Sequence, residues 1–301
     1  MVYKEDGKPL QAAGEYERIV SETDNKELKR EALQQSADLY VTAKATNDAL
    51  RVYNHFVEMF PHPIEDAVET RNKMANIYKE SGNHTKYLQQ LTIIVDADKH
   101  AGKERTDRTR YLAAEAALVL AEPVLKRFYD VKLVKPFKKN LRKKNSRMKA
   151  AIDTYGKLLD YQVGDVTAAA TYQLAEIYYN FSRSLMNSER PDHLSALELE
   201  QYNIMIEDQA YPFEEKAISV HEKNLELLSV GIYNAWIEKS LAKLAVLMPA
   251  RYAKPEQDSS YVENLVPVKN KQAPMAPGAT PPTEKPVAKP DATAAMNGDL
   301  Q

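Results

Sequence analysis

Small and bulky apolar residues alternate at helical spacing through the first hundred residues, and the pattern occurs twice. In the first copy the positions are Ala37, Tyr40, Ala49, Tyr53 and Phe56. In the second copy, 38 residues later, they are Ala75, Tyr78, Tyr87, Leu91 and Ile94. Two amphipathic helices pack closely where a small residue on one admits a large residue from the other. The pattern therefore predicts two successive pairs of antiparallel helices, each pair one unit of a repeat.

Turn and capping residues mark where these helices begin and end. The stretches KATND (44–48) and ESGNH (80–84) predict turns inside the two pairs, and Pro61 to Pro63 predicts the end of the first pair. Ser195 with Glu198 is the pattern of a capping box. Pro212, followed by two glutamates, predicts a further helix start.

The pattern continues more loosely towards the C-terminus. Ala151 precedes Tyr155, and Ala175 precedes Tyr178, at the spacings of the first copy. Residues 108–159 are therefore interpreted as one enlarged helical pair. A closing helix is expected to present one apolar face, made of Trp236, Ile237, Leu241, Leu244 and Leu247. At the other end, Ala12, Ala13 and Tyr16 fit the second helix of a pair, so we expect the chain to be the C-terminal part of a longer protein.

These residues resemble the tetratricopeptide repeat. The positions that match its pattern are Ala37, Tyr40, Ala49, Tyr53 and Pro61, while Leu33 and Ser36 replace its Trp and Leu. The 38-residue step also exceeds the usual ~34 of that family. The resemblance implies an all-α fold, a right-handed superhelix of antiparallel helix pairs, over residues 1–254. Residues 255–301 are rich in Pro, Ala and Lys and are expected to be a disordered tail.

Charge is distributed unevenly along the chain. Residues 126–149 contain eleven Lys or Arg and one acid, whereas the whole chain carries a formal charge of −2. One interpretation is a solvated helix face whose lysine stems cover apolar surface. The other is a contact with an acidic protein or anionic lipid, ahead of nucleic acid. The candidate contact residues are Lys138, Lys139, Arg142, Lys143, Lys144 and Arg147.

The tetratricopeptide resemblance also implies a binding surface along the first helix of each pair. Its candidate residues are Gln34, Asp38, Asn72, Asn76, Lys79, Tyr172, Glu176 and Tyr179. Asn76 matches the Asn of the family's carboxylate-gripping version, but Asn72 stands where that version has Lys. For each position, plain solvent exposure is an equally good interpretation.

Other kinds of site find no support in the sequence. Cys is absent, no HExxH or GxSxG motif occurs, and no Gly-rich phosphate loop is present, so we expect neither an enzyme nor a cofactor. The longest apolar run, residues 111–125, is shorter than the ~20 residues of a membrane span, so no transmembrane segment is expected.

Residues 150–256 resemble the terminal region of large tetratricopeptide-repeat proteins of Gram-negative cell envelopes. This implies a periplasmic or outer-membrane-associated scaffold, with the cytoplasm as the alternative location. Residues 1–20 lack the apolar centre of a signal peptide. We therefore expect a protein-binding adaptor, and an electrostatic binder of polyanions through residues 126–149 is the alternative.

Overall fold

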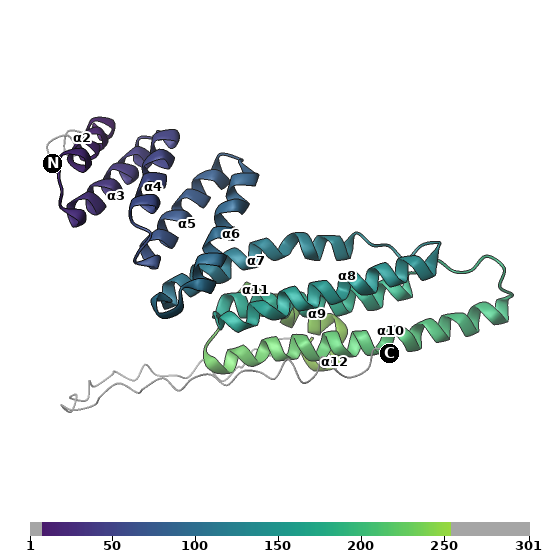
Figure 1. Ribbon diagram of the computed structural model, residues 1–301. Coiled ribbons are helices and arrows are strands. Elements are labelled where there is room, and N and C mark those ends of the chain that lie inside the picture. The colour runs from purple at the N-terminus through teal and green to yellow at the C-terminus, as the bar shows by residue number, and fades with distance from the viewer. Residues whose placement is uncertain (1–7, 254–301) are drawn as a thin grey trace, which may run out of the picture.

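Residues 8–253 are described by the computed structural model, and within this range helices are the only regular elements (Figure 1). The predicted all-α helical repeat is confirmed. The helices are α2 (Pro9–Glu22), α3 (Lys26–Thr42), α4 (Thr46–Met59), α5 (Ile64–Glu80), α6 (His84–His100), α7 (Asp107–Tyr129), α8 (Phe137–Leu158), α9 (Gly164–Met186), α10 (Ala196–Leu225), α11 (Ala235–Leu247) and α12 (Pro249–Tyr252). The predicted tail, residues 255–301, lies outside the described residues.

The 38-residue repeat is a repeat of backbone geometry. The first and last residues of α5 each follow those of α3 by 38 positions, and α6 begins 38 residues after α4. In the two turns, Lys44 and Gly82 occupy equivalent positions and both have a left-handed backbone, with φ of 58° and 72°. The next amide N–H in each turn donates to the carbonyl of Tyr40 or Tyr78, at 2.9 and 2.8 Å.

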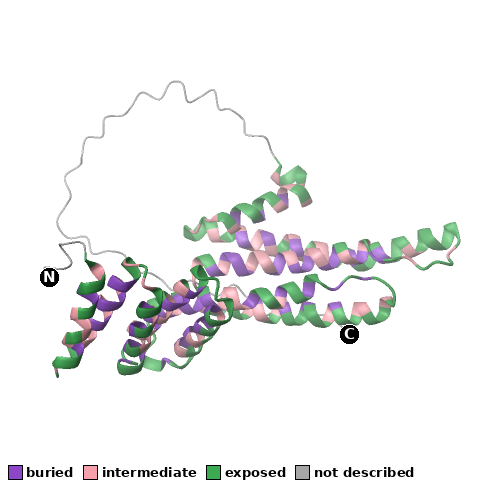
Figure 2. Cartoon of the chain, turned by 90° about the horizontal axis from the view of Figure 1, so that it is seen from above, coloured by how far each residue is buried: buried purple, intermediate pink, exposed green. Residues whose placement is uncertain are grey.

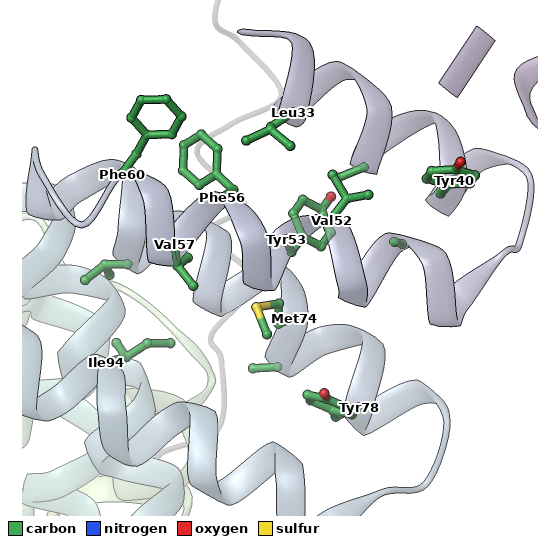
Figure 3. Close-up of a cluster of buried hydrophobic side chains, with 14 of the residues drawn as sticks. Leu33, Tyr40, Val52, Tyr53, Phe56, Val57, Phe60, Met74, Tyr78 and Ile94 are labelled. Carbon is green, nitrogen blue, oxygen red and sulfur yellow. The ribbon is translucent and has the colours of Figure 1, made fainter. Parts of the chain in front are cut away.

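Small residues admit large ones as the sequence pattern predicts. Ala37 and Ala75 are both fully buried, and so are Phe56 and Ile94. In Figure 3 the Phe56 ring of α4 lies beside Leu33 of α3, while Met74 and Ile94 fill the space on the other side of α4. Full burial of a side chain of this size contributes about 1.5–3 kcal/mol of stability. Both alanines are buried in the same hydrophobic core, in agreement with the predicted interlocking.

The length and direction of the helices change at α7. Helices α2 to α6 are short, whereas α7 to α10 are longer and lie alongside one another at an angle to the N-terminal stack (Figure 1). Two hydrophobic cores result, and α7 belongs to both: Ala113 and Ala116 lie in the first core, and Ala114 and Ala121 in the second. In both halves the buried residues follow the facing sides of the helices (Figure 2).

The first helices of successive pairs form a row. Helix α5 contacts α7, α7 contacts α9, and α9 contacts α11. Helix α11 therefore packs on α9 as the first helix of a following pair would. None of the helices described is long and apolar enough to cross a membrane.

The helix start predicted at Pro212 is wrong. Pro212 lies inside α10, which continues without interruption from Ala196 to Leu225. Its ring removes one backbone hydrogen bond, but the residue is exposed, so the freed carbonyl can reach water. Ile206 and Ala210 before it and Ala217 after it lie on one buried face of a helix that packs against α9, and this packing keeps the helix continuous across Pro212.

The other two helix predictions near the C-terminus differ in outcome. The Ser195 capping box is confirmed, because the Ser195 N–H donates to the Glu198 carboxylate at 2.8 Å and the Ser195 hydroxyl accepts from the Glu198 N–H. In α11, Ile237 and Leu244 are buried as expected, but Leu241 is 46% exposed. Ser240, and not Leu241, lies on the buried side of α11.

Candidate protein-binding surfaces

The predicted binding residues of α3 and α5 occupy equivalent positions. Asn72 follows Gln34 by 38 residues, and Asn76 follows Asp38 by the same step. Asn76 and Lys79 are exposed, whereas the other three are half-buried. We call this set, Gln34, Asp38, Asn72, Asn76 and Lys79, the α3–α5 surface.

Asp38 fixes the geometry of the α3–α5 surface. Its carboxylate accepts a hydrogen bond from the Tyr53 hydroxyl of α4 at 2.5 Å and from the Lys73 ammonium of α5 at 2.8 Å. Burial, together with the bond to Asp38, raises the pKa of the Tyr53 hydroxyl. One carboxylate thus joins three helices. Asn76 and Lys79, on the same helix as Lys73, are exposed, and the Lys79 ammonium lies 5.9 Å from the centroid of the Tyr87 ring of α6.

The predicted residues of α9 are in a different situation, because α11 lies on them. The Tyr172 ring packs against Trp236 with centroids 5.5 Å apart. The Lys243 ammonium lies 3.0 Å from the Glu176 carboxylate and 4.3 Å from the centroid of the Tyr179 ring. The prediction that these three α9 residues line an open surface is therefore wrong. They hold the next helix of the same chain.

A buried polar cluster completes this contact. His221 of α10 and Ser240 of α11 are both fully buried, and the His221 Nδ1 lies 3.2 Å from the Ser240 hydroxyl. The Asn224 amide donates to the same hydroxyl at 2.8 Å. On its other side the His221 Nε2 lies 3.3 Å from the Glu176 carboxylate, at ion-pair distance but without hydrogen-bond alignment.

The serine, histidine and glutamate are the residue types of a catalytic triad, but Ser240 and His221 are fully buried between the helices. Burial raises the pKa of the Glu176 carboxyl, and its interactions with His221 and Lys243 outweigh this effect, so the net pKa lies below the ordinary value. Because Ser240 and His221 are fully buried, no substrate reaches them in this conformation. The Ser240 hydroxyl interacts with His221 and Asn224 and so joins α11 to α10, which explains why Ser240 faces inwards.

The basic residues of α8 form an exposed face. Lys138, Lys139, Arg142, Lys143 and Arg147 are all exposed; the first three lie on the side of α8 opposite its buried residues, and Lys143 and Arg147 lie nearer to those residues. Within residues 8–253, none of these five cations pairs with a carboxylate. We call them the basic face.

Lys144 does not belong to the basic face, contrary to the prediction from its charge. The residue is 1% exposed, and its ammonium donates to the Val131 carbonyl and the Asn180 side-chain oxygen, each at 3.0 Å. Burial lowers the pKa of this ammonium to about 8. The ammonium also lies 4.4 Å from the centroid of the Phe128 ring. Lys144 thus attaches the segment after α7 to α8 and α9.

The spacing of the buried residues along α8 indicates that Lys144 is a core position. Met148, Ala151, Tyr155 and Leu158 follow one another at steps of three and four residues along the buried side of α8. Continuing this series towards the N-terminus by one step of four reaches Lys144, and a further step of three reaches the half-buried Leu141. The lysine therefore occupies a core position of the helical pattern.

The comparisons with known proteins do not assign this chain to a family. No family model matches the sequence, and no curated protein matches it. A solved structure described as "Computational Design of Self-Assembling Cyclic Protein Homooligomers" is similar over 80% of this chain and 90% of that chain, with 14% sequence identity and a TM-score of 0.25. A similarity at this TM-score carries no argument about fold or function.

Proposed function

We propose that the chain is a non-enzymatic scaffold of the tetratricopeptide-repeat type, which binds a segment or helix of another protein on the α3–α5 surface. The observation that carries the proposal is the position of Asp38, which bonds to α4 and α5, together with the exposed Asn76 and Lys79 of α5. Stacked helical pairs present extended, stiff surfaces, and binding by such a surface loses little freedom of the receptor.

Cross-linking in a native lysate, followed by mass spectrometry of the attached peptides, tests this proposal. Partner peptides are expected on Lys73 and Lys79, and the double variant Asn76→Ala/Lys79→Glu is expected to lose those on Lys73, the lysine that it retains. Lys99→Glu is the matched control, because Lys99 is an exposed cation on the second helix of the same pair. The proposal fails if the double variant and the control retain the same cross-linked partners.

A second candidate function is electrostatic binding of a polyanion, and the five unpaired cations of the basic face favour it. Sedimentation with vesicles of anionic or zwitterionic lipid tests it. Binding to anionic vesicles should fall steeply as salt rises and should disappear in the triple variant Lys138→Glu/Lys139→Glu/Lys143→Glu. Equal sedimentation with both lipids would refute it. Lys144 is left unchanged in this variant, since it is buried.

We also propose a location in a Gram-negative cell envelope. This rests on the resemblance of residues 150–256 to the terminal region of envelope scaffolds. Fractionation of cells that express the natural gene tests it, and recovery in the cytoplasmic fraction alone would contradict it.

A further inference from the structure

Helix α10 has two apolar faces, and only one of them is covered. Ile206, Ala210 and Ala217 lie on the buried face, which packs against α9. Leu197, Ile204 and Tyr211 follow one another at seven-residue intervals and are 65%, 54% and 59% exposed. Since successive helical residues turn by about 100°, these three lie in one stripe that points away from α9. Within residues 8–253, α10 packs chiefly on α9 and α11, and Figure 1 shows it at the edge of the long helices.

The second face carries a regular pattern of charge. A glutamate follows each residue of the stripe by three positions: Glu200, Glu207 and Glu214. The next positions are Gln201, Asp208 and Glu215. From Ala196 to Glu215 the helix contains six carboxylates and neither Lys nor Arg. In the part of the chain that the structure describes, no cation pairs with Glu200, Glu207 or Asp208. The stripe of Leu197, Ile204 and Tyr211 with these flanking acids is called the α10 outward face.

This pattern selects the chemistry of what can cover it. An apolar residue every seven positions supplies one of the two apolar positions of a coiled-coil heptad, and the acids beside it favour a partner helix of opposite charge. Two copies of the α10 outward face would place glutamates against glutamates, and such like-charge contacts oppose pairing. The basic face of a second copy offers cations, but the residues it exposes are charged and give no apolar cover for the stripe.

We propose that the α10 outward face docks a basic amphipathic helix of another protein, which covers Leu197, Ile204 and Tyr211 with apolar residues and places Lys or Arg beside the glutamates. From Leu197 to Tyr211 the stripe rises by fourteen residue steps, about 21 Å or two heptads, so a partner helix of three heptads is long enough to cover it. The inference rests on the proposed protein-binding function and assigns it a second surface, separate from the α3–α5 surface.

A defined peptide tests the docking directly. The probe is a fluorescent helical peptide of about three heptads, with Leu at the core positions and Lys at the flanking positions. Its binding to the full chain is followed by fluorescence anisotropy. A second peptide of the same composition has its lysines and leucines rearranged to remove the heptad, and a third has Glu in place of Lys. The first peptide should bind at least about tenfold more tightly than the second. The third should not bind.

Variants of exposed residues locate the site without disturbing the fold. Ile204→Ser/Tyr211→Ser should weaken binding of the first peptide about tenfold or more. Glu207→Lys should weaken it and should permit binding of the Glu peptide. Val246→Ser is the matched control, because Val246 is an exposed apolar residue of α11, at 73%, outside the face. It should leave the affinity unchanged. Circular dichroism confirms that each variant retains its helices.

Two results would overturn the docking proposal. Equal binding of the regular and rearranged peptides would show general charge attraction without a heptad site. Sedimentation of the chain alone as a dimer that Ile204→Ser/Tyr211→Ser dissociates would show that a second copy covers the face. Asn76→Ala/Lys79→Glu should not alter binding of this peptide. The experiment therefore distinguishes a failure of the docking proposal from a failure of the proposed binding function of the α3–α5 surface.

Discussion

Replacing Lys144 by methionine removes a buried charge while keeping a long side chain. The ammonium is surrounded by the carbonyls of Phe128 and Val131 and by the Asn180 amide oxygen. Within the described residues, no carboxylate lies at ion-pair distance from it. Transfer of an ammonium out of water disfavours its charged form, and three neutral oxygens compensate for this only in part.

The magnitude follows from the pKa. Burial lowers the pKa of Lys144 from an ordinary value of 10.5 to about 8. At about 1.4 kcal/mol for each pH unit, the difference between the protonation states is about 3 kcal/mol. Between about pH 8 and pH 10.5 the unfolded chain binds more protons at this lysine than the folded chain does, so the contribution of Lys144 to stability rises with pH in that window. Below about pH 8 the contribution is at its lowest and constant.

The assay is urea unfolding followed by circular dichroism at several pH values from about 7 to about 10.5. The free energy of unfolding of the natural chain minus that of Lys144→Met should increase by about 3 kcal/mol across this range. Titration of tyrosines and of other lysines is common to both proteins and cancels in the difference. Lys143→Met is the matched control, because it removes an exposed neighbouring charge and should give a flat difference. A flat difference for Lys144→Met as well would refute the reasoning.

Three further substitutions test the repeat and its caps by thermal or urea unfolding. Lys44→Gly should stabilise the chain by up to about 1 kcal/mol, because Lys44 has a left-handed backbone where the second repeat has Gly82; a loss of stability would contradict this. Phe56→Ala should destabilise it by about 3–5 kcal/mol through a cavity beside α3, and a loss below about 1 kcal/mol would refute the packing. Ser195→Ala should cost about 1 kcal/mol and increase amide exchange in the first turn of α10, whereas unchanged exchange would show that the cap is unimportant.

The N-terminal repeat could be predicted from sequence because its determinants are local. Small and large residues at a fixed spacing identified the packed faces of α3 to α6, and the turn residues identified their ends. The buried state of Ala37 and Ala75 follows from the same spacing. Each helix end and each buried position in this region depends on neighbours within about one helical pair, so short-range sequence patterns are enough to predict it.

The C-terminal half depends on contacts between distant residues, and there the sequence was a weaker guide. The interaction of Glu176 with Lys243 joins residues on α9 and α11, so the covering of Tyr172 and Tyr179 could not be read from α9 alone. Pro212 has the features of a helix start, but packing on both sides of it overrides the local preference. Lys144 was missed because charge, rather than position in the helical pattern, was given more weight.

Helix α7 has a mechanical consequence for the molecule. Its neighbouring residues Ala113 and Ala114 lie in different hydrophobic cores, so the helix cannot rotate about its axis without disturbing side-chain packing on both sides. A rotation of the N-terminal stack about the axis of α7 therefore requires side chains to repack in both cores.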